Sequence, residues 1–184
     1  MLGNDIVDLQ KAKAESNWQR NGYLSKIFTA EERIQILNSP DPDIIVWLLW
    51  SMKEATYKIV NRERLQRFYS PKKFSCQLNG SNGLVNFESR IFYTGSEISK
   101  KLIHTIASAE KQNLAFIQTY YTENKHDYAL AFNTKSNLYY LEKDAYGIPN
   151  LVDKKTGESY AVSISHHGAY LAISAHFLLQ KFSC

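Results

Sequence analysis

Residues 42–61 predict one long helix with two different faces, and this helix limits how the chain can fold. Apolar residues recur at the three- and four-residue spacing of a single helical stripe, namely Ile45, Leu48, Met52, Ala55 and Ile59. On the opposite side, Trp50, Glu54 and Lys58 follow one another at one-turn intervals, and Trp47 falls in the same sector. The stripe should face the core, which leaves a carboxylate and an ammonium beside aromatic rings on the other face.

The second face allows two interpretations. Glu54 and Lys58 can be a solvated i,i+4 ion pair, which contributes about 0.3–0.5 kcal/mol. Alternatively, they belong to a functional site. Two tryptophans on a face exposed to water favour the functional interpretation, because large apolar surfaces of this kind are usually covered by a ligand or partner.

The bulk properties indicate a globular protein with an acidic or phosphorylated partner. A chain of 184 residues fits one domain, or one domain with a large insertion. Its formal charge of +4 is too small for a protein that coats nucleic acid. Cys76 and Cys184 cannot build a disulfide framework. Acids near the N-terminus and the absence of a long apolar run predict a cytoplasmic protein with no membrane segment.

The rest of the pattern predicts an α+β fold in which an antiparallel sheet packs against the long helix. Thr29, with Glu32 three residues later, predicts a capped helix start. The expected strands are residues 2–9, 74–78, 84–93, 98–107, 114–121, 138–144, 160–165 and 169–175, with a turn at Thr94-Gly95-Ser96. Residues 127–132 fit either a helix or a strand, and no internal repeat is visible.

Two further stretches contain candidate functional residues. Arg62 to Lys73 holds five basic residues and one acid, so it is either a solvated basic face or a contact for phosphate or an acidic protein. His166 and His167 lie at a bend between two strands. Adjacent strand residues point to opposite faces, so this pair is a weak metal site, and a turn histidine bonded to backbone is the simpler interpretation.

Several of these stretches together resemble the 4′-phosphopantetheinyl transferases, in particular the compact acyl-carrier-protein synthase branch. The matching motifs, in chain order, are Gly3-Asn-Asp-Ile-Val-Asp8, Phe28-Thr-x-x-Glu32, Trp50-Ser-x-Lys-Glu-Ala-x-x-Lys58, Lys143-Asp-Ala-Tyr-Gly-Ile-Pro149 and Val162-Ser-Ile-Ser-His166. They cover residues 1–62 and 139–175. The resemblance implies a single domain over 1–184, with residues 79–137 as a poorly matched insertion.

By this resemblance, the chain transfers the phosphopantetheine arm of coenzyme A to a serine of an acidic acyl or peptidyl carrier protein. Asp5 and Glu54 would hold Mg²⁺, a hard cation that accepts few carboxylates and keeps positions for phosphate. Lys58 would bind the pyrophosphate, and Glu54 would activate the serine directly or through a water on the metal. Coenzyme A would also contact Ser165, His166, Arg62 and Arg64, with Lys72 and Lys73 as less specific partners.

The chain also departs from the family pattern. Asn61 stands where a glycine is usual, and Val7 occupies the position where longer members carry a third acid, so the resemblance implies a two-carboxylate site. Arg20 and the basic segment before Phe28 are candidates for docking the carrier protein. A homo-oligomer remains possible. The alternative functions are a non-catalytic module that binds coenzyme A or an acidic protein and, less favoured, a nucleic-acid-binding domain.

Overall fold

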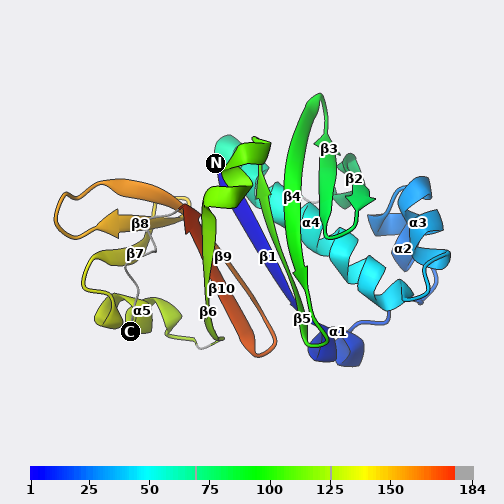
Figure 1. Ribbon diagram of the computed structural model, residues 1–184, viewed down its shortest axis with the longest axis horizontal. Coiled ribbons are helices and arrows are strands. Elements are labelled where there is room, and N and C mark those ends of the chain that lie inside the picture. The colour runs from blue at the N-terminus through cyan, green and yellow to red at the C-terminus, as the bar shows by residue number, and fades with distance from the viewer. Residues whose placement is uncertain (69, 125, 177–184) are drawn as a thin grey trace.

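The structure is a computed structural model, which describes residues 1–68, 70–124 and 126–176. It contains two antiparallel five-stranded sheets (Figure 1). The first sheet has the order β1-β5-β4-β3-β2 and consists of β1 (Leu2–Asp8), β2 (Phe74–Asn79), β3 (Asn82–Phe87), β4 (Arg90–Ile98) and β5 (Leu102–Ser108). The second has the order β6-β10-β9-β8-β7 and consists of β6 (Ile117–Glu123), β7 (Tyr139–Lys143), β8 (Pro149–Asp153), β9 (Ser159–His167) and β10 (Tyr170–His176).

The helices are distributed unevenly between the sheets. They are α1 (Leu9–Glu15), α2 (Tyr23–Ile27), α3 (Ala30–Leu37), α4 (Pro42–Arg64) and α5 (Tyr128–Lys135), with short 3₁₀ turns η1 (Pro71–Lys73) and η2 (Lys111–Phe116). Helix α4 packs across the first sheet, and α5 packs on β7 of the second. The predicted α+β fold is therefore confirmed. No helix in the described ranges is both long and apolar enough to cross a membrane.

The two sheets repeat one topology. In each, the first strand lies at one edge, the fifth pairs with it, and the remaining strands follow in reverse chain order. A helix follows the first strand in both halves, α4 in one and α5 in the other. The repeat is one of strand order, and the sequence carries no visible trace of it. Residues 79–137, the segment predicted as an insertion, supply β3, β4, β5, β6 and α5, so they contribute to both sheets.

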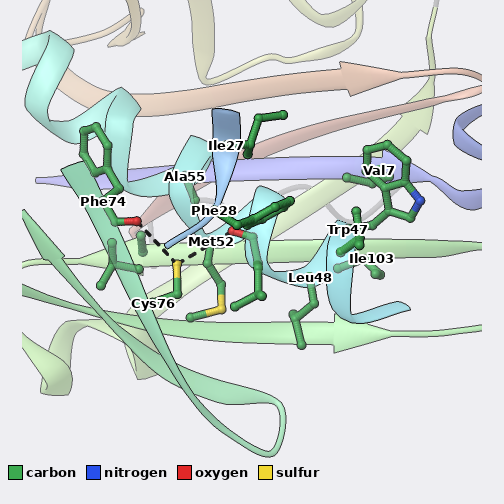
Figure 2. Close-up of a cluster of buried hydrophobic side chains, with 14 of the residues drawn as sticks. Val7, Ile27, Phe28, Trp47, Leu48, Met52, Ala55, Phe74, Cys76 and Ile103 are labelled. Carbon is green, nitrogen blue, oxygen red and sulfur yellow. Dashed lines mark hydrogen bonds between the residues drawn. The ribbon is translucent and has the colours of Figure 1, made fainter. Parts of the chain in front are cut away.

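Helix α4 runs from Pro42 to Arg64, three residues beyond the predicted end. The predicted stripe is buried at Leu48, Met52, Ala55 and Ile59, while Ile45 is partly buried. Trp47 was expected on the functional face, but the structure places it in the core cluster together with Val7 and Ile103 (Figure 2). The apolar face of α4 is broader than one stripe because the helix is covered on two sides, by the sheet and by the helices that precede it.

Strand β1 lies unusually close to α4, and Gly3 makes this approach possible. A Cβ atom at position 3 would stand 1.9 Å from the backbone oxygen of Ala55 and 3.2 Å from a side-chain carbon of Ile59. Any side chain would therefore push β1 away from the helix. Gly3 thereby places Asp5, two residues later on the strand, beside the polar face of α4.

The predicted strand boundaries between residues 84 and 107 are wrong. The chain turns at Glu88-Ser89, not at Thr94-Gly95-Ser96, because Phe87 pairs with Arg90 in the β3–β4 hairpin. Glu88 adopts a left-handed conformation with φ of 54° that glycine or asparagine normally supplies. Gly95 instead lies inside β4, opposite Asn82 and Ile106. Turn signals that rest on glycine therefore pointed to the wrong position.

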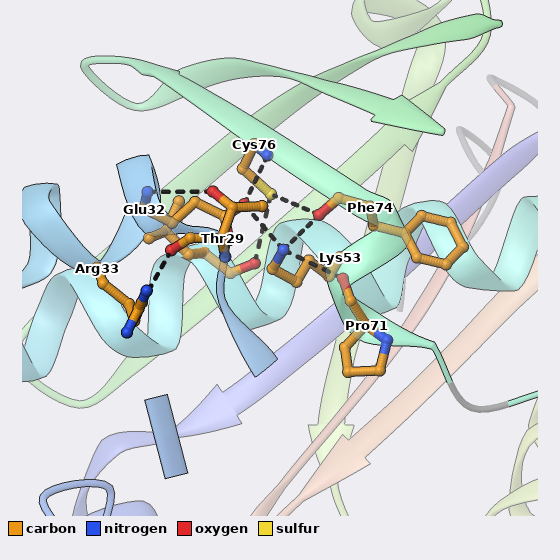
Figure 3. A network of polar contacts seen from close by, with 8 residues as sticks. Thr29, Glu32, Arg33, Lys53, Pro71, Phe74 and Cys76 are labelled. Atoms are coloured by element: carbon orange, nitrogen blue, oxygen red, sulfur yellow. Dashed lines mark hydrogen bonds and ion pairs between the residues drawn. The ribbon is translucent and has the colours of Figure 1, made fainter. Parts of the chain in front are cut away.

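A buried ion pair joins α3, α4 and the start of β2 (Figure 3). Lys53 and Glu32 have side chains only 1% exposed, and the Lys53 Nζ lies 2.8 Å from Glu32 Oε1. The ammonium also donates to the carbonyl oxygens of Pro71 and Phe74. Glu32 in turn accepts the N–H of Cys76 and completes the predicted capping box with Thr29. All three ammonium protons thus have acceptors, as a buried charge requires.

We expect Gly3→Ala to lower the free energy of unfolding by about 2 kcal/mol or more, because the added methyl group displaces β1 from α4. Chemical denaturation should measure the loss. Gly95→Ala is the matched control, since its Cβ would meet no atom closer than 3.6 Å. If both variants are equally stable, the contact between β1 and α4 does not require glycine.

Lys53→Met should lower the free energy of unfolding by about 3–5 kcal/mol, because it leaves the Glu32 carboxylate buried without a cation. The double variant Lys53→Met/Glu32→Gln should recover part of the loss. Lys11→Met serves as the control, since the Lys11–Glu15 pair is exposed and should contribute little to stability. A similar small loss in Lys53→Met would contradict a structural role for the buried pair.

Candidate functional site

Asp5, Glu54 and Lys58 meet where β1 lies against the polar face of α4. The Lys58 Nζ lies 3.8 Å from Asp5 Oδ1, and the side chains of Lys58 and Asp5 are 30% and 15% exposed. The same ammonium donates to the backbone oxygens of Asn4, at 2.7 Å, and of Ile164, at 3.2 Å. Lys58 thus contacts β1 of the first sheet and β9 of the second.

Burial disfavours the charged forms of all three side chains. It raises the pKa of Asp5 to about 7, against the opposing effect of Lys58, and the charge of Glu54 raises it further. Burial also raises the pKa of Glu54, while Lys58 lowers it. The pKa of Lys58 is lowered by burial, although both carboxylates favour its charged form. Two carboxylates that repel each other in a buried site favour binding of a cation.

The residues present fit a magnesium ion. Asp5 Oδ2 is buried and has no hydrogen-bond partner in the described part of the chain, so one carboxylate oxygen is unused by the protein. No cluster of three or more His, Cys, Asp or Glu side chains suited to a metal occurs among the described residues. A two-carboxylate set matches the way proteins commonly hold Mg²⁺, which takes its remaining ligands from water and substrate phosphate.

A cleft of about 290 Å³ opens beside this group and runs between the two sheets. One wall comes from α4 and the loop after it, with Lys58, Arg62 and Arg67. The other comes from the second sheet and the β7–β8 turn, with Tyr146 and His166. The structure therefore brings together two groups of motifs that lie about 100 residues apart in the chain, as the 106-residue separation of Lys58 and Ile164 illustrates.

A second cavity, of about 520 Å³, adjoins Glu54 and is mostly apolar. We refer to it as the aromatic pocket, since its lining includes Trp50, Tyr57, Phe68 and Phe74. Phe68 and Phe74 stack with their ring centroids 6.1 Å apart. Trp50, which the sequence placed on the functional face, therefore lines a cavity next to Glu54.

Only some of the residues predicted to bind coenzyme A line the cleft. Lys58, Arg62 and His166 line the cleft. The guanidinium of Arg62, however, already donates to Asn150 Oδ1 and to the backbone oxygens of Pro149 and Val162, so it joins α4 to the second sheet. Ser165 is buried and does not line the cleft. The cleft geometry thus supports Lys58 and His166 as ligand contacts more directly than the other predicted residues.

The predicted basic contacts outside the cleft have other neighbours. Arg64 pairs with Glu88 and lies over the ring of Phe87, away from the cleft lining. Lys72 and Lys73 are exposed on η1, and Arg20 lies over the ring of Tyr23. These positions do not support a role for Arg64 in binding coenzyme A.

The two histidines of β9 have separate roles, as their alternation predicts. His166 is exposed and lines the cleft. His167 faces β1, where its Nδ1 accepts the N–H of Asp8 at 2.9 Å. Ser163, four residues earlier on the same face of β9, accepts the N–H of Asn4 at 2.9 Å. Side chains of β9 thus bond to the edge of β1 that no strand covers.

Sequence reasoning assigned no individual role to Lys53, Tyr146 or Asn150, and it included Arg67 only as part of the basic segment Arg62 to Lys73. Lys53 could have been found, because it lies next to Met52 on the buried side of α4 and a buried lysine requires an acid. Tyr146 belongs to a turn that the sequence identified only by its glycine and proline, and Asn150 follows that turn. Their participation depends on the packing of the two sheets, which no local pattern encodes.

Asp5→Asn should raise stability at neutral pH when a chelator is present. A carboxyl group whose pKa is raised by folding stabilises the fold fully below its unfolded pKa of 3.8, and loses that contribution as the pH rises through its folded pKa of about 7. The variant should therefore exceed wild type by at least about 1.4 kcal/mol at pH 8, the equivalent of one pKa unit. Thermal unfolding between pH 5 and pH 8 measures this.

Asp8→Asn is the control on the same strand, and it should lower stability at neutral pH, whereas Asp5→Asn should raise it. Asp8 caps α1 and accepts the N–H of Ala169, and these backbone bonds lower its pKa in the folded protein. Its contribution is present above the unfolded pKa and lost as the pH falls, so Asp8→Asn should cost about 1 kcal/mol at neutral pH. Equal effects of the two variants would contradict the assigned environments.

Comparison with known proteins agrees with the geometry. No curated protein matches the chain. A family model described as the 4'-phosphopantetheinyl transferase superfamily matches residues 1–132. The match includes β1 and α4, which carry Asp5, Glu54 and Lys58, and most of residues 79–137. The chain therefore belongs to the 4'-phosphopantetheinyl transferase superfamily.

Proposed function

We propose that the protein is a Mg²⁺-dependent transferase that moves the phosphopantetheine arm of coenzyme A to a serine of an acidic carrier protein. The observation that supports this most strongly is the meeting of Asp5, Glu54 and Lys58 at a cleft lined by His166 of the other sheet. Two carboxylates and an ammonium beside such a cleft suit a ligand that carries a pyrophosphate and arrives with a divalent cation.

Coenzyme A, when bound, would occupy both cavities. The polar cleft suits the nucleotide end, with Lys58 and His166 as phosphate contacts. The aromatic pocket next to Glu54 suits the less polar pantetheine arm. The pyrophosphate then lies near Asp5, Glu54 and Lys58, where Asp5 and Glu54 would hold the cation. Bound there, Mg²⁺ would offset the negative charge that develops on the phosphates.

Glu54 would accept the proton of the serine, and Lys58 would offset the negative charge of the leaving group. The serine hydroxyl of the carrier protein attacks the phosphorus that bears pantetheine, and the bond from this phosphorus to the bridging oxygen breaks. Adenosine 3′,5′-bisphosphate leaves with the electron pair. Glu54, whose pKa is raised by burial, would accept the serine proton and release it to solvent. Lys58, fixed by Asn4 and Ile164, would offset charge on the leaving phosphate.

The direct test is mass spectrometry of several apo carrier proteins after incubation with the protein, coenzyme A and Mg²⁺. A modified carrier should gain the mass of one phosphopantetheine arm. Glu54→Gln should lower the rate at least about 100-fold, the usual range for loss of a general base, and remain folded. Glu63→Gln is the control, because Glu63 lies on the same helix but pairs with the distant Arg90. Absence of product with every carrier would overturn the proposal.

A non-catalytic module that binds coenzyme A is the second candidate, since the same cleft would serve it. Calorimetry separates the two functions. The transferase should bind coenzyme A more tightly with Mg²⁺ than with a chelator, and Asp5→Asn should remove the difference. Binding that is indifferent to Mg²⁺, combined with no transfer, would favour the binding module.

A further inference from the structure

Arg67 lines both cavities. Among the described residues, it is the one member common to the lining of the cleft and that of the aromatic pocket. Lys58 lines only the cleft, and Glu54 lines only the pocket. Arg67 therefore lies between the two cavities.

Arg67 differs from the two arginines that precede it in that its charge is not paired within the described chain. Arg62 donates to three oxygens that join α4 to the second sheet. Arg64 forms an ion pair with Glu88. The described residues provide no carboxylate within ion-pair distance of Arg67, and its side chain is exposed. An unpaired guanidinium at the edge of two cavities is available to bind an anion.

The chemistry of the ligand indicates which anion this would be. The inference rests on the proposed function, in which the nucleotide occupies the cleft and pantetheine occupies the aromatic pocket. The phosphate that bears pantetheine then lies at the boundary between them, and this is the phosphate that is transferred. Arginine presents two parallel N–H donors that match two non-bridging phosphate oxygens.

We propose that Arg67 is a catalytic residue that binds the non-bridging oxygens of the phosphate being transferred. Its donors hold these oxygens while the serine oxygen bonds to phosphorus and the bond to adenosine 3′,5′-bisphosphate breaks. The serine proton passes to Glu54, as in the proposed reaction, and Arg67 itself neither gains nor loses a proton. Such a donor acts most strongly in the transition state, where charge accumulates on these oxygens.

The test compares Arg67→Ala, Arg67→Lys and Arg90→Ala with wild type, in the presence of Mg²⁺. We expect Arg67→Ala to lower kcat about 100-fold or more, as the loss of one transition-state donor commonly does. Arg67→Lys should retain an intermediate rate, because it keeps the charge without the two parallel donors. Arg90→Ala is the control, because Arg90 pairs with Glu63 and lines neither cavity, and it should keep kcat within about threefold of wild type. Unchanged thermal unfolding of the exposed Arg67 variants would show that they remain folded.

Binding of adenosine 3′,5′-bisphosphate provides the second measurement, since this product lacks the transferred phosphate. Calorimetry should show that Arg67→Ala weakens coenzyme A binding but changes the affinity for adenosine 3′,5′-bisphosphate by less than about threefold. An equal loss for both ligands would overturn the inference, because Arg67 would then bind the nucleotide. A kcat within threefold of wild type in Arg67→Ala would overturn it as well.

These outcomes can be told apart from failure of the proposed function. If wild type modifies a carrier and Arg67→Ala does so equally well, only the role of Arg67 is lost. If wild type modifies no carrier, the two binding measurements still show whether Arg67 contacts the phosphate next to pantetheine. A selective loss of coenzyme A affinity would then support that contact in a binding module, and equal affinities would overturn it.

Discussion

The position of β1 controls the site, because this strand is held from three sides. Its backbone pairs with β5, its Gly3 lies against the backbone of Ala55 in α4, and its other edge bonds to side chains of β9. The last contact is unusual for a strand edge, since Ser163 and His167 serve as acceptors in place of a neighbouring backbone. Asp5 is therefore fixed relative to α4 and to the second sheet, and both are needed to form the cleft.

The contact between the sheets also depends on a polar network centred on Asn4. This fully buried amide donates to Ala172 O and Ser174 Oγ of β10, and it lies 3.4 Å from the Nε2 of His104. The hydroxyl of Tyr121 donates to Glu97, so its oxygen accepts from Nδ1 of His104. Burial lowers the pKa of His104 to about 4, which keeps it neutral as this pattern requires. Polar networks of this kind favour one relative orientation of packed elements over others.

Local patterns predicted the elements well, and contacts between distant segments poorly. The helical stripe and the Thr29–Glu32 capping box follow from residue spacing, and the family resemblance implied the convergence of Asp5 with Lys58. Trp47 was misplaced because burial of α4 on two sides cannot be read from one helix. The β3–β4 turn was misplaced because Glu88 adopts a left-handed conformation without glycine. Ser165 matched a motif, yet β9 turns it away from the cleft, and the repeated topology has no sequence signal at all.

The repeated topology explains why the charges of the site are so strongly perturbed. The first half of the chain supplies Asp5, Glu54 and Lys58, and the second supplies His166, so the site must lie at the junction of the sheets. A junction excludes water, and this burial raises the pKa of both carboxylates and lowers that of Lys58. The free protein therefore carries an electrostatic cost that a bound cation and phosphate would relieve. The packing that buries these charges is the same packing that brings the two halves of the site together.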